Sequence, residues 1–281
     1  ELKNGYIEAS AKKLIGCEIN FPGISVTGTE NIMMAAVLAS GQTILRNVAK
    51  EPEVEDLANF LNSMGAKISG AGTDEIIING VDNLIESIFT IPADRIEAGT
   101  YLIAAAVTYG DITIQNINPN RMNNILDKLK LSGAHIETNE NSISLSMPNE
   151  IINSVDISTA PFPGFPTDMQ AQFTVLNALS NSSAVVTENV FENRFMHVQE
   201  LNRMGCDITV KGSNAFVKGV NFLTGAPVMA TDLRASASLI LAGLCADGET
   251  IVDRIYHIDR GYERIEEKLS YLGADITRLP G

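Results

Sequence analysis

Apolar and polar positions alternate along this chain in a unit that recurs four times. Each unit opens with a helical stretch rich in small apolar residues, and these stretches are residues 31–39, 99–108, 169–179 and 236–246. A polar turn, a short β-branched strand and an amphipathic helix follow, and then a strand, a turn and another strand. Because the opening helix is so apolar, the pattern predicts a tandem-repeat α/β fold with helices packed inside and sheets outside.

A glycine follows the amphipathic helix in every unit. The four segments are SMGAKI (63–68), LSGAHI (131–136), RMGCDI (203–208) and YLGADI (271–276), and their glycines are spaced by 68, 72 and 68 residues. Glycine is the residue that best tolerates the left-handed backbone found just after many helices. A generic α/β protein would show such agreement only by chance, so four aligned copies favour a true repeat.

Composition and charge narrow the classes of partner. The chain has 281 residues and a formal net charge of −14, which argues against nucleic acid or an anionic membrane surface as its main partner. A small anionic substrate remains possible, since it needs only a local cluster of arginines. The most apolar stretch, residues 239–246, is far shorter than the roughly 18 residues that a membrane helix needs.

The ends and the cysteines suggest a compartment and a longer parent protein. Residues 1–4 show no signal peptide, and the three cysteines form no CxxC pair, so a reducing, cytoplasmic setting is expected. The first residue is not Met, which predicts that the chain has been cut from a longer protein. The scattered histidines and cysteines show no metal-ligand spacing, and we expect neither a metal nor another cofactor.

Four long strings of residues resemble one family of enzymes. The strings are FPTDMQAQF (165–173), FENRFMH (191–197), ATDLRASAS (230–238) and DRIYHIDRGYER (253–264), with support from TENIMMAA (29–36). Together they resemble the enolpyruvyl transferases that act on UDP-N-acetylglucosamine, and the match covers essentially the whole chain. The sister family that makes 5-enolpyruvylshikimate 3-phosphate shares the fold but not these strings.

The resemblance implies a fold, a domain division and a reaction. The fold is an inside-out α/β barrel with three repeated units in each of two domains, so about four of six units are present. Residues 1–92 would be the end of the first domain, and residues 93–281 would be nearly all of the second, which in the family also takes a strand from the N-terminal segment. The reaction transfers the enolpyruvyl group of phosphoenolpyruvate to the sugar 3′-hydroxyl, releases phosphate and begins peptidoglycan synthesis.

The missing N-terminal third matters for activity. The resemblance implies that it carries a Lys-Asn pair, an arginine for the phosphate and a mobile loop with the reactive cysteine. We therefore expect this chain alone to be inactive, because the group that protonates the methylene carbon is absent. The three cysteines that are present, Cys17, Cys206 and Cys245, are interpreted as core residues.

Asp168 is the candidate for the base that takes the hydroxyl proton. It follows Pro166 and Thr167 at the start of a predicted apolar helix. An aspartate in that place is often no more than a helix N-cap, and only the match to the family string favours catalysis. A carboxylate that removes a hydroxyl proton needs either a raised pKa or strict positioning.

Arginines are the candidates for binding the anionic substrates. Arg234 and Arg260, each placed at a predicted helix start, match family positions, and a guanidinium binds carboxylate and phosphate oxygens well. Their neighbours Asp232 and Asp259 offer the alternative of plain surface ion pairs. Arg194 is a weaker candidate that could equally brace the Asp168 region.

The nucleotide-sugar contacts implied by the resemblance fall on four residues. Ile24, Ser25 and Val26 would meet the diphosphate and uracil side, and Val190 would contact the sugar ring. Without the resemblance, residues 24–26 read as an ordinary strand end. Two positions depart from common family forms. Gly23 stands where some members have a lysine, so an ion pair from that side chain is absent, and residues 27–29 (TGT) stand where Gly-Ala-Thr is frequent.

Three classes of function stay open. The first is an active transferase whose missing third belongs to the same protein. The second is a non-catalytic paralogue or fragment that binds a nucleotide sugar or a regulatory partner. The third is a purely structural repeat protein, which does not account for Asp168, Arg234 and Arg260 at the ends of the repeats.

Overall fold

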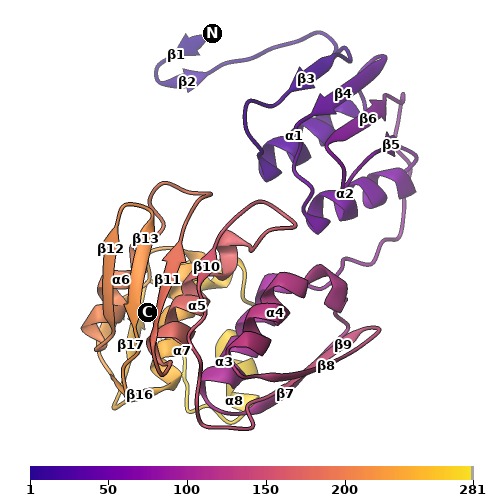
Figure 1. Cartoon of the computed structure of the whole chain (residues 1–281). Coiled ribbons are helices and arrows are strands. Elements are labelled where there is room, and N and C mark those ends of the chain that lie inside the picture. Colours follow the sequence, from indigo (N-terminus) through magenta and orange to yellow (C-terminus); the bar gives the residue numbers. More distant parts are fainter. Residues whose placement is uncertain (280–281) are drawn as a thin grey trace. The chain divides into compact units, whose positions relative to one another are not determined.

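The computed structural model describes residues 1–279 and divides into two units, which are described separately (Figure 1). The first unit comprises Glu1–Pro92 together with Pro161–Pro163. The second unit comprises Ala93–Ala160 and the chain from Gly164 onward. Among the described residues, no helix is long and apolar enough to cross a membrane.

The first unit holds one repeat, which we define as residues 18–79. Its elements are β3 (Glu18–Asn20), α1 (Val26–Ala36), β4 (Gln42–Arg46), α2 (Pro52–Ser63), β5 (Lys67–Ser69) and β6 (Glu75–Asn79). The strands form a sheet in the order β3-β4-β6-β5, in which only the β3–β4 pair is parallel. Met33, Leu45 and Ile76 are fully buried in the core beneath this sheet. A short exposed hairpin of β1 (Leu2–Lys3) and β2 (Tyr6–Ile7) precedes the repeat.

The second unit holds three further repeats. The second repeat, residues 95–146, consists of α3 (Arg95–Val107), β7 (Asp111–Gln115), η1 (Pro119–Arg121), α4 (Asn123–Leu131), β8 (His135–Asn139) and β9 (Ser142–Ser146). The third, residues 157–218, consists of β10 (Ile157–Ser158), η2 (Thr167–Met169), α5 (Gln170–Ala178), β11 (Ser183–Thr187), α6 (His197–Arg203), β12 (Asp207–Lys211) and β13 (Asn214–Lys218). The fourth, residues 223–276, consists of β14 (Leu223–Thr224), β15 (Pro227–Met229), α7 (Leu233–Leu244), β16 (Ala246–Asp247), β17 (Ile251–Asp253), η3 (Ile255–Arg260) and α8 (Ile265–Tyr271).

The opening helices of these three repeats form the interior of the second unit. Helices α3, α5 and α7 contact one another, and every residue of α5 is buried. The sheets lie outside them, with the order β7-β9-β8 in the second repeat and β10-β11-β13-β12 in the third (Figure 1). The predicted arrangement of helices inside and sheets outside is confirmed. It follows from sequence because a helix that is apolar on every face has to be surrounded by other elements.

The repeated glycines end the second helix of each repeat in the same way. Gly65, Gly133, Gly205 and Gly273 all have φ between 95° and 107°. In each case the N–H two positions past the helix cap donates to the carbonyl of a buried leucine five residues earlier, at 3.0–3.2 Å, as in Ala66 to Leu61. This is the Schellman arrangement, which satisfies carbonyls that a helix end leaves free. The predicted role of the glycines is therefore confirmed.

Several helices begin earlier than the apolar pattern predicted, because polar caps determine their first turns. Helix α1 begins at Val26 rather than at residue 31, after Ser25, whose Oγ accepts the N–H of Gly28 at 3.1 Å. Asp94 and Asp232 cap α3 and α7 through two backbone N–H groups each. A capping side chain satisfies donors that the helix itself cannot, so it sets the boundary more firmly than the first apolar residue.

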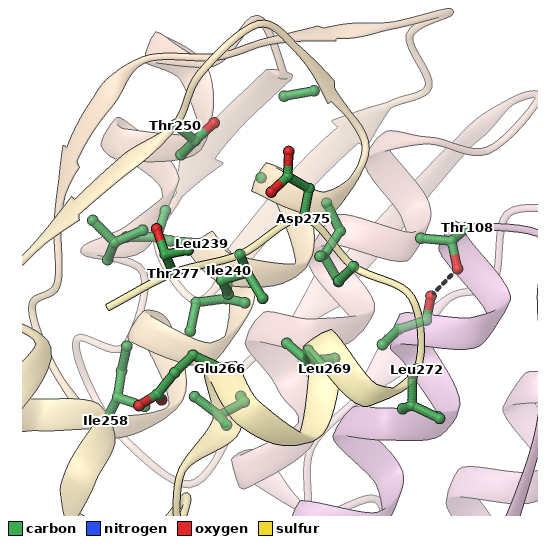
Figure 2. A pocket seen from close by; sticks show the side chains of 18 of the residues that line it. Thr108, Leu239, Ile240, Thr250, Ile258, Glu266, Leu269, Leu272, Asp275 and Thr277 are labelled. Atoms are coloured by element: carbon green, nitrogen blue, oxygen red, sulfur yellow. Dashed lines mark hydrogen bonds between the residues drawn. The ribbon is translucent and has the colours of Figure 1, made fainter. Parts of the chain in front are cut away.

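The fourth repeat departs from the predicted pattern. Its strands form only the parallel pairs β14–β16 and β15–β17, and within the described residues no strand follows α8. The hairpin expected after α8 is therefore absent from the described residues. A cavity of about 1200 Å³ lies at this place, between α3, α7, α8, β17 and the tail from Ala274 to Leu279. Figure 2 shows Asp275 and Thr277 of the tail near Leu239 and Ile240 of α7.

Candidate active site

Two arginines from different repeats hold the carboxylate of Asp168. Nη2 of Arg194 donates to Oδ1 of Asp168 at 2.8 Å, while Nε and Nη2 of Arg234 donate to Oδ2 at 3.2 and 3.1 Å. The Asp168 side chain is 36% exposed, and those of Arg194 and Arg234 are 21% and 11% exposed. The structure thus brings three of the predicted residues into one cluster that solvent can still reach.

The alternative role of Asp168 as a helix cap is wrong. Asp168 is the middle residue of η2, the turn that precedes α5, and Pro166 occupies the N-cap position. Among the described residues, the Asp168 carboxylate accepts only from the two guanidinium groups. A carboxylate satisfied by two charged donors has no need of backbone N–H groups, which explains why the usual role of an aspartate at a helix start is not taken here.

The two arginines outweigh burial in setting the acidity of Asp168. Burial by itself raises the pKa of the carboxyl group, but the charges of Arg234 and then Arg194, with their hydrogen bonds, bring the pKa below its ordinary value. Asp168 is therefore ionised and only weakly basic in this state. A catalytic base needs either a raised pKa or strict positioning. In this state the pKa of Asp168 is not raised, but two arginines hold its carboxylate in position.

Other residues of the third repeat hold the Arg194 side chain in place. It lies in the loop between β11 and α6, and its Nη1 donates to Oγ1 of Thr167 at 2.7 Å. Its guanidinium carbon lies 4.8 Å from the centroid of the Phe191 ring, which is within the range of a cation–π contact. Arg194 therefore both binds Asp168 and is itself oriented by the turn that carries Asp168.

Glu188 is a residue of this site that the sequence analysis missed. It is 2% exposed, and its Oε2 accepts the hydroxyl of Thr167 at 2.8 Å. Its Oε1 accepts the hydroxyl of Thr159 and the N–H groups of Val190 and Phe191, at 2.9–3.1 Å. This buried carboxylate fixes the loop that carries Val190 and Arg194. Its position directly after a β-branched strand and before FENRFMH was the available signal.

Arg234 is braced by the interior of the unit. It is the second residue of α7, and its Nη1 donates to the phenol oxygen of Tyr262 at 3.3 Å, with its guanidinium carbon 5.5 Å from that ring centroid. The Asp232 carboxylate does not form the suggested ion pair with an arginine. It accepts hydrogen bonds from the backbone N–H groups of Arg234 and Ala235 instead. Asp232 thus fixes the backbone of Arg234 at the start of α7, and Tyr262 fixes its guanidinium group.

Arg260 makes no hydrogen bond or ion pair to Asp168 among the described residues. It is the exposed last residue of η3, so the predicted helix start is wrong, and α8 begins only at Ile265. Its neighbour Asp259 pairs with Arg278, at 2.6 Å. A role for Arg260 in binding an anion therefore stays a prediction.

The residues predicted to contact the nucleotide sugar lie in both units. Ile24, Ser25 and Val26 belong to the first unit, where Ile24 is 47% exposed and Ser25 caps α1. Their alternative interpretation as a strand end is wrong, because a helix begins there. Val190 belongs to the second unit and is 40% exposed beside Glu188. The contacts of all four with a ligand stay predictions.

The cysteines fit their predicted packing role only in part. Cys206 is buried and Cys245 partly buried, and burial raises the pKa of both thiols to about 12. Cys17 is exposed, so its assignment to the core is wrong, since it precedes the edge strand β3. Among the described residues, no group of three or more histidine, cysteine or acidic side chains is placed to hold a metal ion.

Comparison with known proteins shows the family of the chain. The family model described as EPSP synthase (3-phosphoshikimate 1-carboxyvinyltransferase) matches residues 1–269, and the chain belongs to this family. The fold agrees, since the crystal structure of the enolpyruvyl transferase NikO from Streptomyces tendae superposes with a TM-score of 0.86 at 25% identity, covering 95% of this chain and 66% of that one. An EPSP synthase structure from Acinetobacter baumannii, at 17% identity, gives a TM-score of 0.71.

Two curated relatives are much more similar in sequence. A UDP-N-acetylglucosamine 1-carboxyvinyltransferase from Coxiella burnetii is 60% identical over 280 residues, which are 99% of this chain and 64% of the relative. A protein of the same name from Hydrogenovibrio crunogenus is 58% identical over 278 residues, or 66% of its length. The chain therefore spans just under two-thirds of the relatives that it matches.

Proposed function

We propose that this chain is the larger part of a UDP-N-acetylglucosamine 1-carboxyvinyltransferase. The complete protein would transfer the enolpyruvyl group of phosphoenolpyruvate to the 3′-hydroxyl of UDP-N-acetylglucosamine and release phosphate. The high identity to relatives of that name supports the substrates. The observation that carries the proposal is the partly exposed Asp168 carboxylate held between two braced guanidinium groups, a pairing of one proton acceptor with two anion-binding groups.

The proposed division of labour follows from the charges. In the free protein, Arg194 and Arg234 stabilise the ionised form of Asp168. An anionic substrate that draws on the same guanidinium groups would weaken this stabilisation and raise the proton affinity of Asp168 when the hydroxyl is in place. Asp168 would then take the hydroxyl proton, and the arginines, together with Arg260, would hold the substrate carboxylate and phosphate.

Each unit carries residues that we propose as contacts of the nucleotide sugar. Ser25 and its neighbours Ile24 and Val26 surround the first turn of α1, where free N–H groups and the helix dipole favour an anion such as a diphosphate. Val190 would contact the sugar ring from the loop that Glu188 holds. Residues 1–92 would then be the end of the first domain of the complete protein, and residues 93–281 nearly all of the second.

The remainder of the complete protein would supply what the fourth repeat lacks. The chain spans 64% of the Coxiella relative, and among residues 1–279 the fourth repeat has no antiparallel strands beside β17. The cavity of about 1200 Å³ between β17 and the tail has unpaired strand edges to receive a strand. We propose that an N-terminal segment of the same protein fills it. The free thiols of all three cysteines support a cytoplasmic location.

The test is an assay of phosphate release by the full-length protein that contains this chain. Release that requires both UDP-N-acetylglucosamine and phosphoenolpyruvate would support the proposal, and the 281-residue chain alone should release none. If shikimate 3-phosphate replaced the nucleotide sugar as the acceptor, the activity would be that of the sister enzymes and the proposal would be wrong. If no acceptor led to release, the alternative of a non-catalytic binding protein would be favoured.

A further inference from the structure

One buried phenol oxygen joins the three central helices of the second unit. Tyr262 is 0% exposed, and its Oη lies 2.9 Å from Oγ1 of Thr100 on α3, 3.4 Å from Nε2 of Gln172 on α5 and 3.3 Å from Nη1 of Arg234 on α7. Thr100 and Gln172 are 1% and 0% exposed. Of these contacts only the one with Arg234 leads to a group that solvent reaches, because Arg234 also holds Asp168.

The direction of the contact between Tyr262 and Arg234 is fixed by chemistry, because a guanidinium group can only donate. The hydroxyl of Thr100 has the carbonyl of Ile96 as an acceptor at 2.9 Å, and the Thr100 and Tyr262 oxygens lie 2.9 Å apart. With Thr100 donating to Ile96, the phenol donates its own hydroxyl proton to Thr100. Its oxygen lone pairs are left for the two donors that point at it, Nη1 of Arg234 and Nε2 of Gln172. The phenol thus acts on Arg234 as an acceptor.

The electrostatics keep the phenol in this role. Burial raises the pKa of Tyr262 despite the opposing charge of Arg234, so the hydroxyl stays protonated at neutral pH. The other charges that act on the pair are Asp168 and Asp94, at the start of α3, while Arg194 faces Asp168 from the opposite side. A protonated phenol accepts from Arg234 without competing with Asp168 for its positive charge.

We propose that Tyr262 is a positioning residue that fixes the guanidinium group of Arg234 against Asp168. With one end of the guanidinium held by the phenol oxygen and the ring, the Nε–Nη2 edge faces the Asp168 carboxylate. The positioning itself is a property of this chain alone. Its value for catalysis rests on the proposed function, because it depends on Arg234 and Asp168 acting in the transfer reaction.

The first experiment tests the positioning on the 281-residue chain, without any substrate. Carbon-13 NMR would follow the titration of the Asp168 carboxyl group in the wild type and in Tyr262→Phe. We expect the pKa of Asp168 to rise in the variant toward its ordinary value, because a loosened Arg234 stabilises the carboxylate less. An unchanged Asp168 titration in a folded Tyr262→Phe protein would overturn the proposal.

A matched control separates this effect from the loss of any buried phenol. Tyr101, on α3, is 7% exposed, and within the described part of the chain its Oη has no hydrogen-bond partner. Tyr101→Phe should leave the Asp168 titration unchanged, and an equal shift in both variants would contradict the proposal. If Tyr262→Phe does not fold, Thr100→Val serves instead, since it removes the acceptor that orients the phenol. It should raise the pKa of Asp168 in the same direction, and no shift there would overturn the proposal.

The second experiment tests the consequence for catalysis in the full-length protein. Tyr262→Phe should lower kcat/KM for phosphoenolpyruvate by about tenfold, the usual cost of losing a hydrogen bond to a charged group. In an Arg234→Lys background the same change should have little further effect, because the phenol acts through Arg234. Equal losses in both backgrounds would contradict the proposal. If the full-length protein proves inactive, the proposed function fails while the NMR experiment still decides the positioning.

Discussion

The third and fourth repeats both contribute to the candidate active site, but only the third has a complete sheet. The third repeat supplies Asp168 and Arg194 and has four paired strands. The fourth supplies Arg234 and Tyr262, yet its strands within the described residues form only two parallel pairs. The site residues lie at the starts of helices and in loops, and these parts are present in both repeats. The comparison therefore shows that the cluster around Asp168 forms although the outer sheet of the fourth repeat is incomplete among the described residues.

The two repeats also hold their last segments differently. In the third repeat, β12 and β13 are joined by a ladder of backbone hydrogen bonds. In the fourth repeat, the tail after Gly273 is held by side chains, since Arg278 binds Asp259 at 2.6 Å and Glu266 at 2.7 Å. Exposed ion pairs contribute much less to stability than a buried sheet. We therefore expect the fourth repeat to be the less stable of the two in this chain.

The largest expected effect concerns the residue that the two repeats share. In the full-length protein, Asp168→Asn should keep substrate binding but lower turnover by roughly 10²–10⁴-fold, the range typical of a lost general base. The amide still accepts hydrogen bonds but has no charge to offer the arginines or the proton. Steady-state phosphate release and a separate binding measurement would show the split. Near-normal turnover would remove Asp168 from the mechanism.

The next prediction compares two equivalent leucines, one near the end of α6 in the third repeat and one near the end of α8 in the fourth. Leu201 of α6 is 0% exposed inside the third repeat, and Leu269 of α8 is 3% exposed but lines the cavity of the fourth. In the 281-residue chain, Leu201→Ala should lower the free energy of unfolding by about 2–5 kcal/mol, as large-to-small core changes do. Leu269→Ala should cost less, because part of its surroundings is already empty. Urea denaturation measures both, and equal losses would contradict the comparison.

The ion pairs of Asp168 should make the junction of the repeats sensitive to acid. The pKa of Asp168 is lowered in the folded protein, so its pairing stabilises the fold above the ordinary aspartate pKa. That contribution should be lost as pH falls through the folded value. Thermal unfolding between neutral pH and about pH 3, near and below the ordinary aspartate range, should show a smaller acid-induced fall in Tm for Asp168→Asn than for the wild type. An identical fall would show that other carboxyl groups dominate.

The smallest effect is expected at the tail of the fourth repeat. Arg278→Ala removes the ion pairs to Asp259 and Glu266. Because Arg278 and Asp259 are exposed and Glu266 is only partly buried, the free energy of unfolding should fall by only about 0–1 kcal/mol, and the difference should shrink as salt is added. Denaturation at low and high salt would measure this. A larger, salt-independent loss would mean that the tail is held by packing.

Much of the fold was predictable because it depends on local signals. The four glycines, the apolar opening helices and strands such as β6 and β9 lie where the sequence pattern predicted them. The starts of α1, α3 and α7 were placed too late, although Ser25, Asp94 and Asp232 are ordinary capping residues. The absence of a hairpin after α8 in the described part of the chain could not be predicted from the repeated glycine, because that glycine indicates where a helix ends and not whether paired strands follow.

The candidate site was predictable only as a set of residue types. Asp168, Arg194 and Arg234 were singled out by their strings, but their contacts join residues 26 and 66 positions apart. No periodicity encodes such distances. Tyr262 was missed for the same reason, because a buried tyrosine has no local signature until its partners are known. Glu188 was missed although its position directly after a β-branched strand offered a signal. Arg260 shows the opposite case, a motif residue that makes no contact with Asp168 among the described residues.

The sequence by itself therefore determined the repeat, the helix ends and the chemical inventory of the site, since these depend on backbone preferences and on residues close together in the chain. The tertiary structure decided which charges meet. It excluded the alternative of a helix cap for Asp168 and placed this residue between two arginines, and it connected Arg234 to α3 and α5 through one phenol oxygen. These outcomes depend on the packing of α3, α5 and α7, which brings distant side chains within hydrogen-bonding distance.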